Sequence, residues 1–166
     1  MAKPTALFIG SFQPYHMGHH MVIQGMTKLA GKIVIGIGSS KKSGDADHPF
    51  TAQERKEMIQ AALQAEDIIP MFDVHLVELP DHEDDERWAQ QVLEAVGPVD
   101  KLWTGDEWTK KCFEGKVEIQ EIKEVPGISS SGIREMMRKG GDWDEQVPDE
   151  VAKAIKNLEG VKRVKA

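Results

Sequence analysis

The stretch that decides the fold is Gly10-Ser-Phe-Gln-Pro-Tyr-His16-Met-Gly18-His19. It follows an apolar run, Ala6–Ile9, that has the composition of a buried strand. It precedes an amphipathic run, His20–Ala30, that has the periodicity of a helix. Histidines and glycines therefore lie together on a turn from strand to helix. In an open α/β sheet, ligands bind at the carboxyl ends of the strands, which is where such turns lie.

A helix that begins at this turn directs unpaired backbone N–H groups and the positive end of its dipole toward a ligand, which suits phosphate. His16 and His19 add side-chain donors, and Gly10 and Gly18 let the backbone approach closely. The alternatives are a pair of exposed histidines without a role, or a metal site that includes His20. The sequence offers no further ligand cluster to complete a metal site. The turn thus predicts a phosphate-binding site.

The rest of the chain alternates strand and helix. The expected strands are Ile33–Ile37, Phe72–Leu79, Lys101–Thr104 and Val117–Val125. One expected helix begins after Thr51, the first residue of the capping box Thr51–Glu54, and another lies around Trp88. Ser130 or Ser131 is expected to cap a third helix, and Pro148 to open the last. Repeated strand–helix units predict a single α/β domain over residues 1–166, Rossmann-like and doubly wound, with a mostly parallel sheet.

Composition narrows the class of protein. A length of 166 residues suits one compact domain, and a net charge of -7 argues against general binding to nucleic acid or to an anionic membrane. The single cysteine, Cys112, excludes an internal disulfide framework. The sequence shows neither a signal-peptide core nor an apolar run long enough to span a bilayer. We therefore expect a cytoplasmic protein with no nucleic-acid partner and no membrane partner.

Two common nucleotide-binding motifs are absent. Gly36-Ile-Gly38 lacks the third glycine of the dinucleotide-binding fingerprint, because position 41 is Lys41. The chain also has no Gly-Lys-Ser/Thr sequence. The sequence therefore predicts neither a nicotinamide-cofactor Rossmann site nor a P-loop.

Two motifs together resemble those of a known superfamily. His16-Met-Gly18-His19 resembles the His-x-Gly-His motif of the nucleotidyltransferases, and Ile128-Ser-Ser-Ser-Gly-Ile-Arg134 resembles their Ile-Ser-Ser-Ser/Thr-x-x-Arg motif. The finer resemblance is to archaeal-type nicotinamide-nucleotide adenylyltransferases. It is carried by Gly38-Ser39, His48–Arg55, Trp88, Thr104-Gly105, Gly141–Trp143 and Gly160–Arg163, which cover nearly the whole chain in order.

The resemblance implies a nucleotidyltransferase fold and an activity. AMP would pass from Mg·ATP to nicotinamide mononucleotide, giving NAD and pyrophosphate, with Mg²⁺ arriving on ATP and no metal-binding residues in the chain. It also implies a homo-oligomer. The acceptor phosphate is already ionised, so the reaction needs no enzyme nucleophile and no strong base. Catalysis would then depend on positioning and on donors aimed at the charge that develops around the α-phosphate.

The resemblance also assigns residues. It implies catalytic roles for His16, His19 and Arg134. The residues expected to bind ATP are Gly10, Ser11, Phe12, Gly18, Gly38, Ser39, Thr104, Gly105, Asp106, Ser129, Ser130 and Ser131. The serines would hold the β- and γ-phosphates while one of them also caps the helix. Trp88 is expected either to stack on the nicotinamide ring or to lie in the core, and Arg55 to contact phosphate or form a surface ion pair.

The chain departs from the family at positions near the substrates. Ser11 and Asp47 stand where some archaeal members have arginine, and Gln90-Gln91 stands where a Gly-His pair often occurs. These departures leave a sibling transferase as an alternative, acting on phosphopantetheine, flavin mononucleotide or a sugar or polyol phosphate. A non-catalytic nucleotide-sensing module is the alternative from another class.

Overall fold

One parallel sheet organises the protein. The computed structural model describes residues 2–165, so the ends of the expected domain, Met1 and Ala166, lie outside the described residues. Within residues 2–165, five strands form the sheet in the order β3-β2-β1-β4-β5, and every neighbouring pair is parallel. They are β1 (Thr5–Gly10), β2 (Lys32–Ile37), β3 (Asp73–Glu78), β4 (Lys101–Thr104) and β5 (Glu118–Glu121). The predicted doubly wound α/β fold is confirmed.

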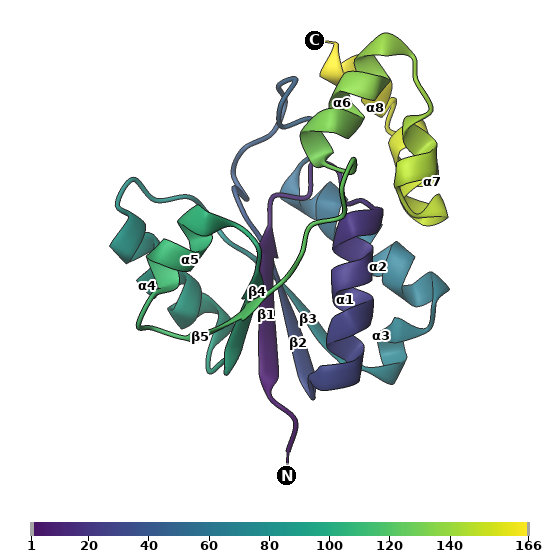
Figure 1. The fold of residues 1–166 in the computed structure, drawn as a ribbon. Helices are drawn as coiled ribbons and strands as arrows, with labels where there is room; N and C mark the ends of the chain where they lie inside the picture. The colour runs from purple at the N-terminus through teal and green to yellow at the C-terminus, as the bar shows by residue number, and fades with distance from the viewer. Residues whose placement is uncertain (1, 166) are drawn as a thin grey trace.

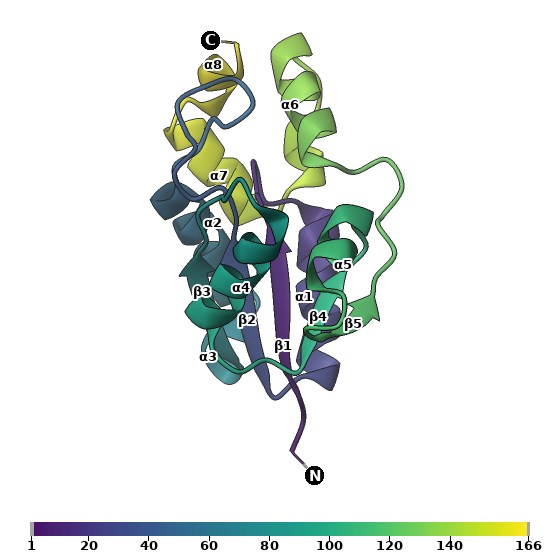
Figure 2. The ribbon, with the colours of Figure 1, turned by 90° about the vertical axis from the view of Figure 1, so that its left-hand side faces the viewer.

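Helices cover both faces of this sheet (Figure 1). One face carries α1 (Met17–Leu29), α2 (Ala52–Ala65) and α3 (Ile68–Met71), and the other carries α4 (Asp85–Val96) and α5 (Glu107–Phe113). Beyond the carboxyl ends of the strands lie α6 (Ser130–Lys139), the 3-10 helix η1 (Trp143–Gln146), α7 (Asp149–Asn157) and α8 (Gly160–Val164) (Figures 1 and 2). No helix within residues 2–165 is long and apolar enough to cross a membrane.

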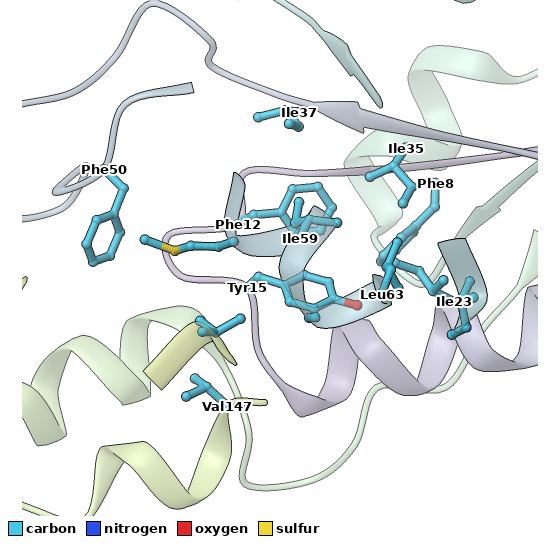
Figure 3. Packing of buried hydrophobic residues seen from close by; sticks show 14 of the residues in the cluster. Phe8, Phe12, Tyr15, Ile23, Ile35, Ile37, Phe50, Ile59, Leu63 and Val147 are labelled. Atoms are coloured by element: carbon cyan, nitrogen blue, oxygen red, sulfur yellow. The ribbon is translucent and has the colours of Figure 1, made fainter. Parts of the chain in front are cut away.

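In the described part of the chain, two hydrophobic cores hold these layers together. Successive residues of a strand point to opposite faces, so Leu7 of β1 packs under α4 and α5 while Phe8 packs under α1 and α2. The core on the α1 side is the larger, and it includes Ile23, Ile35 and Ile59 (Figure 3). Burying one such side chain stabilises the fold by about 1.5–3 kcal/mol.

The structure corrects several expected boundaries. Helix α1 begins at Met17 instead of His20, and β5 ends at Glu121 instead of Val125. The helix after Pro148 is followed by α8, so it is not the last. The short elements α3, α5 and η1 were not expected at all. The earlier start of α1 matters most, because it places His19 in the first turn of that helix.

Candidate active site

A cavity of about 260 Å³ opens where β1 and β4 end. The chain leaves β1 toward one side of the sheet and β4 toward the other, so this is the switch point at which open α/β sheets bind ligands. The cavity is lined by Phe8, Ile9, His16, Gly18, His19, Val22, Thr104, Gly105, Asp106, Ile122, Lys123, Glu124, Val125, Ile128, Ser129 and Ser130. Parts of both predicted motifs therefore line one cavity.

Direct hydrogen bonds join the two motifs. Ser130 Oγ donates to the Pro14 carbonyl oxygen at 2.9 Å, and Arg134 Nη1 donates to the Gln13 carbonyl oxygen at 2.8 Å. The start of α6 is thus fixed to the turn between β1 and α1, although the partners are more than one hundred residues apart in sequence. This contact places the N-terminal ends of α1 and α6 at the same site.

His16 and His19 cap α1 reciprocally. His19 N–H donates to His16 Nδ1 at 3.3 Å, and His16 N–H donates to His19 Nδ1 at 3.2 Å. The two rings stack with centroids 3.6 Å apart. Because both Nδ1 atoms accept, each neutral ring carries its proton on Nε2. The cap therefore leaves one Nε2–H donor on each ring for a ligand.

Gly18 makes room for this arrangement. A Cβ atom at position 18 would lie 2.9 Å from His16 Cε1 and 3.0 Å from His16 Nδ1. The first distance is shorter than real Cβ contacts and the second is tighter than nine in ten of them, so a larger residue would displace the His16 ring. The glycine of the first motif thus lets the imidazole fold back against the helix.

Both histidines are neutral at physiological pH. Burial lowers the pKa of His16 to about 4. Burial also holds the pKa of His19 well below its usual value, and the adjacent His16 ring lowers that pKa further. The rings therefore act as hydrogen-bond donors in the free protein, and a bound polyanion would raise both pKa values.

We expect acid to destabilise the protein through His16. Its folded pKa is about 4 and its unfolded pKa is about 6.5, so the unfolded state binds more protons between these values. This stabilisation is fully present above pH 6.5 and is lost as pH falls toward 4. Urea titration should show a contribution of about 2 kcal/mol lost between pH 7.5 and pH 5. The variant His16→Asn should show a shallower pH slope; an unchanged slope would contradict this assignment.

The start of α6 presents backbone N–H groups to the cavity. Ser129 is the N-cap, because its Oγ accepts from Gly132 N–H at 3.0 Å, and this corrects the expectation that Ser130 or Ser131 caps the helix. Ser129 and Ser130 line the cavity, whereas Ser131 is exposed outside the lining. Arg134 does not line the cavity; its Nη1 donates to the Gln13 carbonyl oxygen, and its Nε is buried and unpartnered among the described residues.

Several other residues at this end of the sheet were predicted to bind ligand. Gly10, Ser11, Phe12, Gly38 and Ser39 do not line the cavity. The Phe12 ring is buried and meets the His19 ring edge-on, with centroids 4.7 Å apart. Arg55 is also fully buried and donates to the carbonyl oxygens of Ser11 and Gly38, both at 2.8 Å. Arg55 is therefore neither a surface ion pair nor a cavity-lining residue.

Trp88 lies in the smaller core. It is buried, its ring stacks on that of Trp108 with centroids 4.9 Å apart, and it meets Phe113 edge-on. It does not line the cavity. Trp108 is half exposed, unlike the other tryptophans. Trp88 therefore lies in the core, which is one of the two alternatives that the sequence left open. Its stacking on a nicotinamide ring stays a prediction.

The sequence did not identify the far wall of the cavity. Ile122, Val125 and Ile128 supply apolar surface there, and Lys123 and Glu124 supply charge. Their alternation of polar and apolar residues favoured a longer strand, but the chain leaves the sheet after Glu121 and crosses toward α6 (Figure 2). The Pro126-Gly127 pair before the second motif was the one signal of a loop.

Comparison with known proteins identifies the family. Residues 7–136 match the family described as cytidylyltransferase-like, so the chain belongs to the cytidylyltransferase-like nucleotidyltransferases. Relatives named nicotinamide-nucleotide adenylyltransferase match nearly the whole chain. It is 34% identical over 165 residues to that of Archaeoglobus fulgidus, across 96% of this chain and 95% of the relative. It is 34% identical over 162 residues to that of Thermococcus kodakarensis, across 96% and 86%. The resemblance inferred from the motifs is confirmed.

Solved structures share the fold. A bifunctional NMN adenylyltransferase/ADP ribose pyrophosphatase from Francisella tularensis, complexed with AMP and a manganese ion, matches with a TM-score of 0.78 and 19% identity. The match covers 98% of this chain and 52% of that chain, so this protein spans about half of its length. A Plasmodium falciparum nicotinic acid mononucleotide adenylyltransferase complexed with APC matches with a TM-score of 0.66 and 16% identity, across 97% and 98%.

Proposed function

We propose that this protein transfers AMP from Mg·ATP to nicotinamide mononucleotide and so forms NAD and pyrophosphate. The observation that carries the proposal is the meeting of the two motifs at one cavity, where His16, His19, Ser129 and Ser130 lie together. Relatives named for this activity cover nearly all of the chain. The names of these relatives support nicotinamide mononucleotide as the acceptor. The residues that line the cavity support transfer of AMP from ATP.

The geometry favours a direct in-line transfer. The acceptor phosphate attacks the α-phosphorus of ATP, a new P–O bond forms, and the bond to pyrophosphate breaks. Nε2–H of His16 and of His19 donates to the α-phosphate oxygens as charge develops on them. The N–H groups at the start of α6, with Ser129 and Ser130, hold the β- and γ-phosphates as the leaving group.

The metal ion belongs to the substrate in this scheme. No group of three or more His, Cys, Asp or Glu side chains within residues 2–165 is arranged to hold an ion. The Asp106 carboxylate at the cavity already accepts from Thr109 N–H at 2.9 Å as the cap of α5. A divalent cation therefore arrives with the phosphates of ATP, where it offsets their charge.

The remaining assignments concern the two ends of the substrates. Thr104 ends β4, Gly105 and Asp106 follow it at the cavity, and we assign the adenosine half of ATP to that wall. Trp88 is buried, and Ser11 and Asp47 stand where some archaeal members have arginine. Binding of the nicotinamide ring therefore requires other contacts or a movement of Trp88. The homo-oligomer implied by the family stays a prediction.

Arg134 tests the phosphate part of the proposal. In the variant Arg134→Met, loss of a charge-assisted donor should raise the KM for ATP about 10- to 100-fold, because such a bond contributes about 1.5–3 kcal/mol. Arg134→Lys should recover only part of this, since lysine lacks the planar fork. Steady-state kinetics measures both. The control Lys139→Met changes an exposed cation on the same helix and should leave KM unaltered; a normal KM in Arg134→Met would remove Arg134 from the site.

An acceptor panel tests the activity itself. Protein and Mg·ATP are mixed with nicotinamide mononucleotide, and NAD and pyrophosphate are followed over time. Parallel reactions contain phosphopantetheine, flavin mononucleotide, nicotinic acid mononucleotide or a sugar phosphate. We expect the fastest release of pyrophosphate with nicotinamide mononucleotide. Faster release with another acceptor would reassign the substrate, and ATP binding with no release at all would favour a nucleotide sensor.

A further inference from the structure

A buried chain of hydrogen bonds lies behind the catalytic histidines. Tyr15 is fully buried, and its hydroxyl is 2.7 Å from His20 Nδ1. His20 is only 1% exposed, and its Nε2 pairs with the carboxylate of Glu66 at the end of α2. Gln24 Nε2 donates to the other carboxylate oxygen of Glu66 at 2.8 Å. This chain of hydrogen bonds therefore connects the turn between β1 and α1 with helices α1 and α2. The proposed transfer reaction does not use it.

The partners fix the direction of each bond. An ionised Glu66 can only accept, so His20 Nε2 carries the proton and donates to it. Burial lowers the pKa of His20, so the ring is neutral, its Nδ1 is an acceptor, and the Tyr15 hydroxyl donates to it. A buried tyrosine hydroxyl needs such a partner, and His20 is the one that the structure provides within residues 2–165. This one arrangement therefore gives a partner to the Tyr15 hydroxyl, to both ring nitrogens of His20 and to the Glu66 carboxylate.

Tyr15 connects this chain to the catalytic ring of His19. The Tyr15 and His19 rings lie nearly parallel, with an interplanar angle of 20° and centroids 5.7 Å apart. Phe12 meets both rings, and Figure 3 shows Phe12 and Tyr15 together in the larger core. The ring that faces His19 is therefore held at its far end by the hydroxyl contact with His20.

We propose that Tyr15 is a positioning residue for His19, and that the His20–Glu66 pair holds Tyr15 in its place. The inference rests on the proposed function of His19 as a donor to the α-phosphate. Its physical basis is that a catalytic donor displaced by about 1 Å can lose about 100-fold in rate. Tyr15 and His20 would act through His19 and would not touch the substrate.

Three variants test this inference. His20→Leu leaves the Tyr15 hydroxyl buried without a partner, so the ring should turn toward water and kcat should fall about tenfold, a partial loss of positioning. KM for ATP should change less than about twofold, because bound phosphates contact other groups. In Tyr15→Phe/His20→Leu the orphaned hydroxyl is gone and a flat ring remains, so kcat should recover. In Tyr15→Leu/His20→Leu the packing is apolar but the ring is lost, so kcat should stay low.

The outcomes separate positioning from stability. The control His75→Leu alters an exposed histidine on β3 and should have normal kcat. A folded His20→Leu variant with normal kcat, or equal recovery in both double variants, would overturn the inference. A readout independent of activity is the NMR shift of the His19 ring protons, which should move in His20→Leu and return in Tyr15→Phe/His20→Leu. Unmoved shifts would overturn the inference, whereas a wild-type protein without transfer would overturn only the proposed function.

Discussion

Replacing His19 by alanine should lower kcat about 100- to 1000-fold, the usual cost of one donor to a transition-state oxygen. His19 is in the first turn of α1, its Nδ1 is occupied by the His16 N–H, and its pKa is held low by burial. Its Nε2–H is thus a neutral donor at the cavity. The effect should be on kcat more than on the KM for ATP, because the oxygens gain charge only during transfer. Steady-state kinetics at saturating Mg·ATP measures it.

Circular dichroism and urea unfolding should confirm that His19→Ala is folded. The matched control is His75→Ala, which removes an imidazole that pairs with Asp73 at the sheet edge. It should have wild-type kinetics. If His19→Ala retains kcat within about threefold while folded, the transition-state donor lies elsewhere, because that is less than one such donor contributes.

The largest effect on stability is expected at Arg55. Arg55→Met should lower the free energy of unfolding by about 3–5 kcal/mol, because several backbone carbonyl acceptors lose their donor and each unsatisfied buried acceptor costs about 1–3 kcal/mol. The guanidinium donates to the carbonyl oxygens of Ser11, Gly38 and Ser39, and these turns follow β1 and β2. Removal leaves buried acceptors without donors. Urea unfolding measures the change.

A matched substitution on the same helix controls for the loss of charge. Lys56→Met changes the adjacent, partly exposed residue and should shift stability by less than about 0.5 kcal/mol. Arg55→Lys should fall between the two, because one ammonium cannot reach three carbonyl groups in fork geometry. A loss below about 1 kcal/mol in Arg55→Met would mean that water replaces the guanidinium, so that no acceptor is left unsatisfied.

Local patterns predicted the order of the elements well. The Thr51–Glu54 capping box is present in full, and β4 has the expected bounds. The start of α1 was missed because histidine is an unusual cap, and only the structure shows His16 and His19 capping each other. Three consecutive serines are equivalent in sequence, so Ser129 could not be chosen as the cap. Asp106 is the N-cap of α5, and an aspartate at such a position is a usual signal for the start of a helix. The helix was not predicted because the segment after Asp106 is short and polar.

Long-range contacts set the limit for the site. The histidines and the serine motif were predicted to share a ligand, and they do line one cavity. The role of Arg55 was not predictable, because its acceptors are backbone carbonyls brought together by two strands. Trp88, Val92 and Val96 lie four residues apart and so share one face of a helix. This spacing predicts the burial of Trp88 but does not exclude a contact with a ligand. The wall from Ile122 to Ile128 depends on where the chain leaves the sheet, which alternation alone does not specify.

The measurement that tests the account most directly is a crystal structure with Mg²⁺ and a non-hydrolysable ATP analogue. The account predicts that the triphosphate spans the cavity, with the α-phosphate beside Nε2 of His19 and the terminal phosphates at the N-terminus of α6, near Ser129 and Arg134. A triphosphate bound away from either the His16–His19 cap or the start of α6 would contradict it.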